Sequence, residues 1–353
     1  MSNPRISGTG LWVPEHVVSN LELVEAFNAY AAGHPEVQPS SVEFIEKASG
    51  IHSRYVLDKQ GVLDPQRLRP RILERPDEEW SVQCEMAGAA AQQALQQAGC
   101  EASQVDGVIV GCSNLQRAYP AVAIEVQKYL GCSGWAYDMN VACSSATFAL
   151  ANACQAVQTG FARRILVISP EITSAHLNFR DRDSHFIFGD ACTAVLVEAD
   201  RGDWEILGCS LATQFSNNIR NNFGFLNPCH EERAHDSDKL FRQNGRAVFR
   251  EVVPLVARHL QAHLQQLGLE SVRRFWLHQA NRHMNDLIAK MVLQREASEQ
   301  EAPVILDEFA NTSSAGSVIA FHRHREDLQA GEVGVLCSFG AGYSVGSVVV
   351  RRL

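Results

Sequence analysis

Residues 138–146 read Asp-Met-Asn-Val-Ala-Cys-Ser-Ser-Ala, and residues 307–315 read Asp-Glu-Phe-Ala-Asn-Thr-Ser-Ser-Ala. Each stretch precedes a helix-like segment and then an apolar strand-like run. Cys143 lies 26 residues before Ser169, and Asn311 lies 27 residues before Ser338. This weak repeat predicts two halves of one layout, 1–200 and 201–353. The first half carries Cys143, the second carries Asn311, and the two residues occupy equivalent places. Chance similarity between two turns of small residues is the alternative explanation.

Short β-branched runs alternate with alanine-rich stretches along the chain. Residues 105–111 and 164–169 are apolar enough for buried strands, and residues 85–97, which stop near Gly99, have the composition of a helix. Strands that alternate with helices form mostly parallel sheets covered on both faces. The sequence therefore predicts an α/β protein, and its 353 residues are enough for two core-forming units.

One stretch, at about 52–80, interrupts this alternation. It contains Pro65, Pro70 and Pro76 and an arginine at positions 67, 69, 71 and 75. Prolines at that density make a regular element improbable. We therefore expect a loop or lid inserted into the first half, and long loops in compact domains are often functional.

The composition excludes several classes of protein. The net charge of -9 argues against a nucleic-acid-binding protein, which usually carries a basic surface. No apolar run approaches the roughly 18 residues that a membrane span needs, and the N-terminal residues lack the apolar core of a signal peptide. We therefore expect a cytoplasmic protein that binds neither nucleic acid nor membrane.

The chain has 10 cysteines, and none of them forms a C-x-x-C pair. Without a secretory signal they are expected to be reduced thiols. His230 and His235 look like part of a zinc protease motif, but they are five positions apart rather than four, so a helix would not present both on one face. We expect a polar loop there and no metal site.

Three residues stand at positions where α/β proteins carry their chemistry. Cys143 follows a strand-like run and precedes a helix, and the positive end of a helix lowers the pKa of a nearby thiol. His278 ends the apolar run 275–277, and Asn311 lies in a turn of small residues. Each alone is more often structural than catalytic. Their occurrence together, at strand ends in two related halves, favours a site built on a cysteine nucleophile.

At this point the chain resembles the thiolase superfamily, and most closely the 3-oxoacyl-acyl-carrier-protein synthase III family. The resemblance covers nearly the whole chain. It rests on Ala142-Cys143-Ser144, the Phe188-Gly189-Asp190 turn, Gly245 with Val248-Phe249, His278-Gln279-Ala280-Asn281, Asn311-Thr312-Ser313, and Gly340-Ala341-Gly342 with Gly346-Ser347. It implies a five-layered αβαβα fold with two pseudo-symmetric halves, a homodimer, and a condensing acyltransferase.

The resemblance also implies a division of labour. Cys143 accepts an acyl group from an acyl-CoA or an acyl carrier protein (ACP), and the backbone N–H groups of Cys143 and Ala341 form an oxyanion hole. His278 and Asn311 donate hydrogen bonds to the thioester oxygen of malonyl-ACP as it loses carbon dioxide. The carbanion then attacks the acyl group to give a 3-oxoacyl product. Neither step needs a metal or a redox cofactor.

The substrate entrance departs from the family. In acetyl-CoA-primed members a tryptophan and an arginine hold the CoA adenine, and here Phe44 and Ala48 take their places. Two further arginines of the family are replaced in this chain by Ala175 and His283. Losing planar charged donors weakens a phosphate site, although Lys47, Arg246 and Arg282 are available to compensate. The residues expected to contact substrate are Phe44, Tyr119, Arg246, Phe249, Asn281 and Arg282.

Tyr119 matches an aromatic residue that in the family crosses the dimer interface to close the acyl pocket. A tyrosine there keeps the pocket short, brings a hydroxyl to a polar chain, or has no effect on selectivity. Three functions therefore stay open: an initiating synthase of fatty acid biosynthesis, a secondary-metabolite ketosynthase that uses a longer or β-ketoacyl donor, and a silent partner in a heterodimer. The complete Cys-His-Asn set argues against the third.

Overall fold

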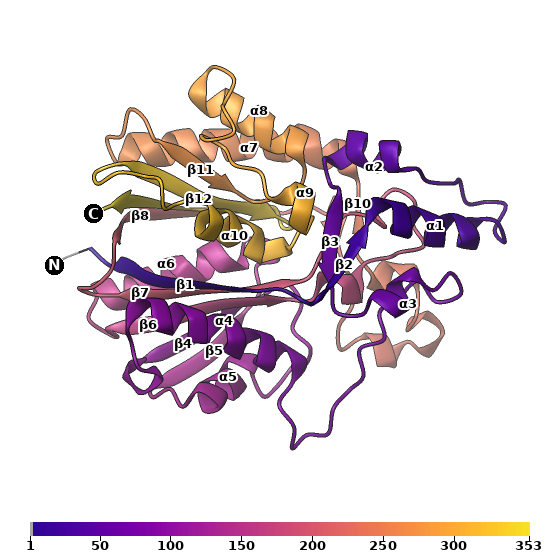
Figure 1. The fold of residues 1–353 in the computed structure, drawn as a ribbon, viewed down its shortest axis with the longest axis horizontal. Coiled ribbons are helices and arrows are strands. Elements are labelled where there is room, and N and C mark those ends of the chain that lie inside the picture. Colours follow the sequence, from indigo (N-terminus) through magenta and orange to yellow (C-terminus); the bar gives the residue numbers. More distant parts are fainter. Residues whose placement is uncertain (1–2) are drawn as a thin grey trace.

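A computed structural model describes residues 3–353, and within them nine strands form one mixed sheet. Its order is β11-β12-β13-β8-β1-β7-β6-β4-β5 (Figure 1). The strands are β1 Arg5–Trp12, β4 Gly107–Gly111, β5 Trp135–Met139, β6 Arg164–Glu171, β7 Ala191–Glu198, β8 Trp204–Thr213, β11 Arg274–Leu277, β12 Val333–Gly340 and β13 Ser344–Arg352.

The sheet consists of two parts that repeat one layout. Counted from the junction, β1, β7, β6 and β4 correspond to β8, β13, β12 and β11. In each part the first three strands are antiparallel neighbours and the last two are parallel. The parts meet where β1 pairs with β8 over only two residue pairs. This is the predicted repeat, with β5 as an extra edge strand of the first part. The division between residues 200 and 201 stays a prediction, and it lies in the connection between β7 and β8.

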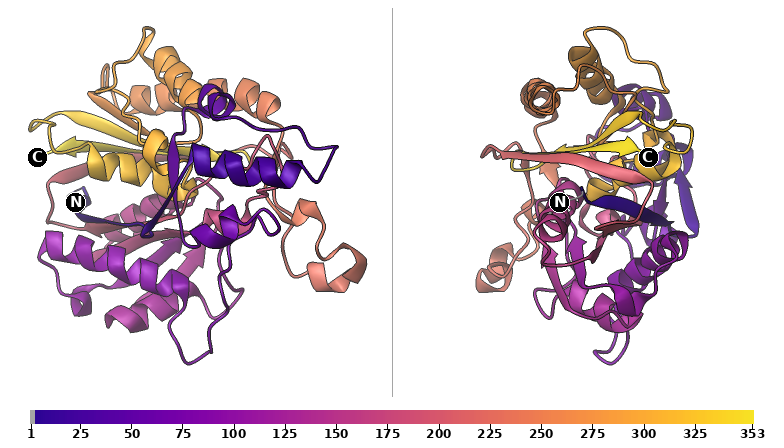
Figure 2. Two further views of the ribbon diagram at one scale, coloured as in Figure 1. Left: turned by 45° about the vertical axis from the view of Figure 1, so that its right-hand side comes forward. Right: turned by 90° about the vertical axis from the view of Figure 1, so that its left-hand side faces the viewer.

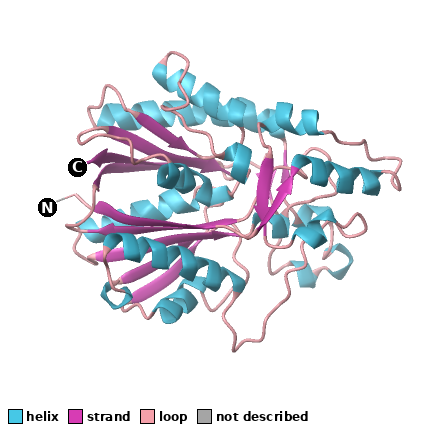
Figure 3. Cartoon of the chain, in the orientation of Figure 1, coloured by secondary structure: helices cyan, strands magenta, loops and turns pink. Residues whose placement is uncertain are grey.

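Helices cover both outer faces and fill the space between the two parts of the sheet (Figures 1 and 3). α4 and α5 lie on one outside and α7 and α8 on the other, while α6 and α10 lie in the middle. α6 contacts strands of both parts, including β6 and β13. The predicted five-layered αβαβα fold is therefore confirmed. These helices are α4 Val82–Ala98, α5 Val122–Leu130, α6 Ser145–Gln158, α7 Gly245–Gln266, α8 Arg282–Leu293 and α10 Gly316–Arg323.

Smaller elements surround one end of this body. Two ribbons, β2 with β3 and β9 with β10, stand apart from the main sheet. The stretch from 221 to 241 projects from the side of the molecule and contains three short 3-10 helices (Figure 2). The remaining strands and α-helices are β2 His16–Ser19, α1 Asn20–Ala31, α2 Val42–Ser49, β3 Ser53–Val56, α3 Lys59–Leu63, β9 Ile219–Arg220, β10 Arg242–Gln243 and α9 Leu306–Phe309, and further 3-10 helices span Ala102–Gln104, Thr173–His176 and Ser313–Ala315.

The predicted loop at 52–80 was wrong over its first part. β3 pairs with β2, and α3 follows at once because the Asp58 carboxylate accepts a hydrogen bond from Gly61 N at its start. Both elements end before Pro65, the first of the three prolines. From residue 64 to 81 the chain forms neither helix nor strand, as predicted for the proline-rich part.

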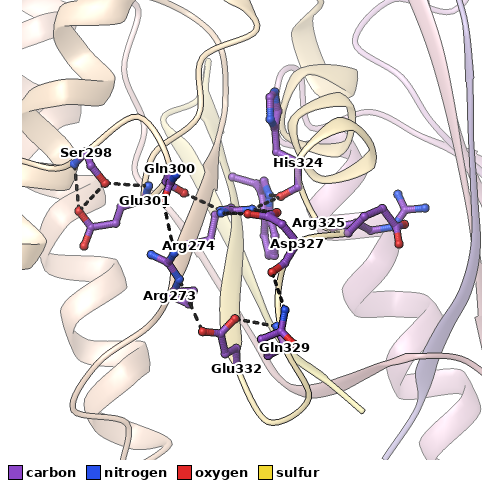
Figure 4. A network of polar contacts seen from close by, with 12 residues as sticks. Arg273, Arg274, Ser298, Gln300, Glu301, His324, Arg325, Asp327, Gln329 and Glu332 are labelled. Carbon is purple, nitrogen blue, oxygen red and sulfur yellow. Dashed lines mark hydrogen bonds and ion pairs between the residues drawn. The ribbon is translucent and has the colours of Figure 1, made fainter.

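A buried arginine anchors the strand that leads to His278 (Figure 4). Arg274, in β11, donates Nη2 to Asp327 Oδ2 at 2.8 Å and Nη1 to the His324 carbonyl at 2.7 Å. Its Nε donates to the carbonyl of Gln300. One guanidinium therefore holds the loops after α8 and α10 against β11, and His278 N continues the parallel pairing to Cys337 O at 2.7 Å.

Candidate active site

Cys143 occupies a sharp turn between β5 and α6. Ala142 adopts a left-handed backbone, with φ of 48°. The Ser145 hydroxyl fixes the turn, donating to Ala142 O at 2.7 Å and accepting from Val141 N at 2.9 Å. Since α6 lies between the two parts of the sheet, this turn holds the thiol at the centre of the molecule.

The strand β12 passes directly against the thiol. A Cβ atom added at Gly340 would lie 2.6 Å from Cys143 Cβ and 3.1 Å from its Sγ. Only glycine fits this approach, which lets the chain continue so that the backbone of Ala341 interacts with the thiol. The closing loop and the nucleophile turn are thus neighbours, as the resemblance implied.

The surroundings of Cys143 shift its pKa in the opposite direction from the one predicted. Desolvation by the protein raises the pKa of the Cys143 thiol to about 11. The Ser313 hydroxyl and the backbone N–H groups of Ala341 and Cys143 lower it, and the charge of Glu171 raises it further. The lowered pKa predicted from the helix start was therefore wrong in direction, because the cost of burying a thiolate outweighs the hydrogen bonds that favour it.

His278 is 1 % exposed, and burial lowers its pKa to about 4. The imidazole is therefore neutral near pH 7 and carries one N–H to donate. Phe339 packs its ring edge to face against the imidazole at 5.2 Å, and Nδ1 is buried without a hydrogen-bond partner in residues 3–353. Such a ring is suited to donating to an uncharged oxygen that gains charge during a reaction.

Asn311 is held by backbone and side chain together. Its N donates to Ile187 O at 2.9 Å, and its carbonyl accepts from Gly189 N at 3.1 Å. The side-chain Oδ1 accepts from Ser313 N at 2.8 Å. Because the amide oxygen is occupied, the NH2 group is the one available to donate.

A cavity of about 530 Å³ brings the three residues together. Cys143, His278 and Asn311 all line it, and so do four of the six residues expected to contact substrate, namely Phe44, Arg246, Phe249 and Asn281. Asn281 also caps α8, since its Oδ1 accepts from His283 N and Met284 N.

Two expected substrate residues lie elsewhere. Tyr119 is 86 % exposed and lines a separate cavity of about 800 Å³ beside residues 72–83. Arg282 packs against Gly50 and forms ion pairs with Asp286 and Glu299 at the surface. Neither side chain lines the Cys143 cavity of its own chain. The substrate contacts expected of both residues, with Tyr119 supplied by a second copy of the chain, stay predictions.

Comparison with known proteins identifies the family. Its profile, described as 3-oxoacyl-[acyl-carrier-protein (ACP)] synthase III, matches residues 137–214, and the profile of its C-terminal part matches residues 262–352. The β-ketodecanoyl-[acyl-carrier-protein] synthase of Pseudomonas aeruginosa is 59% identical over 332 residues, which cover 92% of this chain and 95% of that protein. The chain belongs to the 3-oxoacyl-[acyl-carrier-protein] synthase III family.

More distant members agree with this assignment. The β-ketoacyl-[acyl-carrier-protein] synthase III of Erythrobacter litoralis is 29% identical over 359 residues, covering 99% of this chain and 100% of that protein. The crystal structure of 3-oxoacyl-[acyl-carrier-protein] synthase III from Aquifex aeolicus has the same fold, with a TM-score of 0.80 at 24% identity over 99% of both chains. The chain is thus a condensing acyltransferase, as predicted.

The entrance residue Phe44 is covered by a guanidinium from a distant segment, although Ala48 and Ala175 stand where the resemblance places arginines. Arg182 lies over the Phe44 ring at 3.8 Å, and Phe186 meets the same ring edge to face. Arg182 Nε donates to Pro39 O at 2.7 Å. No local pattern marks Arg182 in the sequence, because the stack joins segments more than a hundred residues apart.

Ser313 is a second residue that sequence reasoning missed. It lies 1 % exposed in the turn after Asn311, with a left-handed backbone at φ of 50°. Its place in the Asn-Thr-Ser motif was quoted for the resemblance only.

No helix in residues 3–353 is long and apolar enough to cross a membrane.

Proposed function

We propose that Cys143, His278 and Asn311 carry out the family's condensation in this chain. Cys143 Sγ attacks an acyl thioester, the acyl group moves to sulfur, and the donor leaves as a free thiol. Malonyl-ACP then loses carbon dioxide, its α-carbon attacks the acyl carbonyl, and Cys143 leaves as the 3-oxoacyl-ACP forms. The observation that carries this proposal is the meeting of all three side chains in one cavity.

The local geometry supports a separate role for each group. The N–H groups of Cys143 and Ala341 interact with the sulfur and are suited to stabilise the oxyanion of each acyl transfer. The neutral His278 ring and the Asn311 NH2 group are donors for the thioester oxygen of the malonyl unit. The proposed chemistry uses thioesters of CoA and of the ACP phosphopantetheine as substrates and needs no other cofactor.

We infer a donor of about eight carbons. The relative at 59% identity is named for a β-ketodecanoyl product, which has a ten-carbon chain. Condensation with malonyl-ACP lengthens a donor by two carbons, because one of the three malonyl carbons leaves as carbon dioxide. An octanoyl donor on Cys143 therefore accounts for such a product.

We further propose that CoA presents this donor. An adenine ring stacks well between an aromatic ring and a planar guanidinium. Phe44 lines the cavity, and Arg182 lies over the Phe44 ring at 3.8 Å. Arg182 would swing aside to admit the base. Arg246 lines the same cavity, makes no hydrogen bond or ion pair within residues 3–353, and is available for a CoA phosphate.

The partners follow from this chemistry. ACP delivers the malonyl unit and carries the product away. A second copy of the chain would insert its exposed Tyr119 toward the acyl chain, as the resemblance implies for the dimeric family. We propose a cytoplasmic location, because the proposed CoA and ACP thioester substrates occur there.

Loading experiments test the proposal. Purified enzyme is incubated with acyl-CoAs of two to twelve carbons and with the matching acyl-ACPs, and the mass of the intact protein and of the Cys143 peptide is measured. We expect octanoyl-CoA to load fastest, and Arg182→Ala to raise the KM for it about tenfold. Arg180→Ala, two residues away and without contact to Phe44, is the matched control.

Each other outcome decides against a part of the proposal. Preferential loading by acetyl-CoA contradicts the chain length, and loading by ACP thioesters alone contradicts CoA. A faster reaction with a β-ketoacyl donor supports the secondary-metabolite ketosynthase instead. Acylation at a residue other than Cys143 overturns the mechanism.

A further inference from the structure

The carboxylate of Glu171, at the end of β6, is fully buried and forms no ion pair within residues 3–353. It accepts hydrogen bonds instead. Ser113 N and Ser314 N donate to Oε1 at 3.0 and 3.2 Å, the Ser113 hydroxyl donates to Oε2 at 2.5 Å, and the Ser314 hydroxyl donates to Oε1. A buried carboxylate without a cation is unfavourable, and here four donors from two residues, one in each half of the chain, offset that cost.

On the side of the second half, these bonds reach the side chain of Asn311. Ser313 and Ser314 belong to one 3-10 turn. Ser313 N donates to Asn311 Oδ1 at 2.8 Å, so the position of this turn sets the orientation of the Asn311 amide. Glu171 holds both the N–H and the hydroxyl of Ser314, the next residue of the turn. The carboxylate therefore helps to fix where the Asn311 NH2 group points.

On the side of the first half, the bonds reach the turn of the nucleophile. Ser113 O accepts from Asn140 Nδ2 at 3.0 Å, and Asn140 Oδ1 accepts from Ala142 N at 2.9 Å. Ala142 has the left-handed backbone that immediately precedes Cys143. Because Glu171 holds the N–H and the hydroxyl of Ser113, the carbonyl of that residue is fixed toward Asn140. The same carboxylate therefore also supports the turn of the nucleophile.

The relative position of these two turns matters for the last step of the proposed reaction. The carbanion forms on the malonyl unit, whose thioester oxygen the Asn311 NH2 group binds, and it must then reach the acyl carbonyl on Cys143. A carbanion that does not reach this carbonyl takes a proton from water, and malonyl-ACP then ends as acetyl-ACP and carbon dioxide. Misplacement of a reacting group by about 1 Å costs about a hundredfold in rate. The ratio of the two products therefore reports how well the two turns are aligned.

We propose that Glu171 is a positioning residue that keeps the turn of Asn311 aligned with the turn of Cys143, so that decarboxylation leads to condensation. Glu171 does not line the cavity of the Cys143, His278 and Asn311 triad, so it contacts no substrate and transfers no proton. The proposal rests on the proposed function, because it uses the roles assigned there to Cys143 and Asn311. It adds the group that couples their two half-reactions.

Glu171→Leu tests this link, because leucine has a similar volume and accepts no hydrogen bond. Enzyme acylated in advance with octanoyl-CoA, or with the acyl-CoA that loads Cys143 best, is mixed with malonyl-ACP, and the acetyl-ACP and 3-oxoacyl-ACP formed are quantified. We expect the ratio of acetyl-ACP to 3-oxoacyl-ACP to rise about tenfold, which corresponds to a misalignment of roughly 0.5 Å.

The conservative variant Glu171→Gln should restore the alignment. Its carbonyl oxygen can accept from the N–H groups of Ser113 and Ser314, and its NH2 group can donate to the Ser113 hydroxyl. We therefore expect its product ratio to stay within about twofold of wild type.

Glu198→Leu is the matched control. Glu198 is also fully buried, and it lies at the opposite end of the β6–β7 pair, where Arg164 Nε donates to it at 2.9 Å. Its loss should destabilise the protein without changing the product ratio. If Glu171→Leu does not fold, Ser314→Ala removes one donor of the network and should raise the ratio about threefold. Thr312→Val, which removes a buried hydroxyl without a hydrogen-bond partner beside the same turn, should leave the ratio unchanged.

An unchanged product ratio in Glu171→Leu, or in Ser314→Ala where the first variant does not fold, overturns the proposal. An equal rise in Glu171→Gln or in Glu198→Leu overturns it too, because the hydrogen bonds of Glu171 would then not explain the effect. Wild type separates this inference from the proposed function. If wild type forms no 3-oxoacyl-ACP with any acyl-CoA, the proposed function fails and the inference fails with it. If wild type forms this product, an unchanged ratio in the variants contradicts the role of Glu171 alone.

Discussion

Gly340→Ala is the sharpest test of the contact between β12 and the nucleophile turn. The added Cβ would lie 2.6 Å from Cys143 Cβ, whereas carbon atoms in good contact are about 3.5–4.0 Å apart. The φ of Gly340 is not positive, so alanine brings no backbone strain and the effect comes from the collision alone. Cys143 must therefore retreat by roughly 1 Å.

The size of the effect follows from this displacement. Hydrogen bonds from Ser145 hold the turn at Cys143, so the thiol cannot retreat freely. A reacting group misplaced by about 1 Å loses about a hundredfold in rate, and one extra carbon in a packed core costs about 1–3 kcal/mol of stability. We expect both losses, with the loss in rate present in the fraction that stays folded.

The assay measures acyl-Cys143 formation by intact mass over time, together with the free energy of unfolding from urea denaturation. Gly33→Ala is the matched control, because its added Cβ meets nothing nearer than 3.7 Å. A Gly340→Ala enzyme that loads acyl groups within about threefold of wild type would refute the reasoning. It would show that the thiol reacts from a position that β12 does not constrain.

Three further predictions concern burial and charge. Arg274→Met should lower the free energy of unfolding by about 2–3 kcal/mol in urea denaturation, because the buried carbonyls of Gln300 and His324 lose their donor. The control Arg273→Ala, at a more exposed position, should lower the same free energy by less than about 1 kcal/mol. Burial raises the pKa of Asp190 from 3.8 to about 6, so its stability contribution is complete below roughly pH 4 and is lost as the pH rises through 6. Between these pH limits the free energy of unfolding of wild type should fall by up to about 3 kcal/mol relative to that of Asp190→Asn, as measured by urea denaturation at each pH. An equal dependence of the unfolding free energy on pH in the two proteins would contradict this. Because the pKa of His278 is lowered to about 4, carbon dioxide release from malonyl-ACP should show no inflection near pH 6.5, and an inflection there would contradict a neutral donor.

Much of the site could be predicted because its chemistry is local in the sequence. Cys143 and Asn311 lie in short turns of small residues that precede α6 and α10, and His278 directly follows the buried strand β11. The repeat of these turns also predicted the two-part sheet. Local patterns of this kind can be recognised in the sequence without knowledge of the tertiary structure.

The residues that were misjudged depend on distant contacts. Arg182 contacts Phe44 from a segment more than a hundred residues away, so the sequence around Phe44 and Ala48 does not reveal this contact. The strand β3 forms because β2 pairs with it, which the prolines further along concealed. In each case the sequence carried the residue type but not its partner.

Burial of the site has one consequence for both ionisable members of the triad. It raises the pKa of Cys143 and lowers that of His278, so the resting pair is thiol and imidazole rather than thiolate and imidazolium. A neutral imidazole can donate to the malonyl thioester, whereas an imidazolium held by a thiolate would be engaged already. The same low dielectric strengthens the N–H groups of Cys143 and Ala341 toward an oxyanion. Burial therefore keeps Cys143 largely un-ionised in the resting enzyme, while it strengthens the stabilisation of the charged states that form during the reaction. That balance predicts that small neutral alkylating reagents, which develop no oxyanion, react slowly with Cys143 even though thioester substrates acylate it readily.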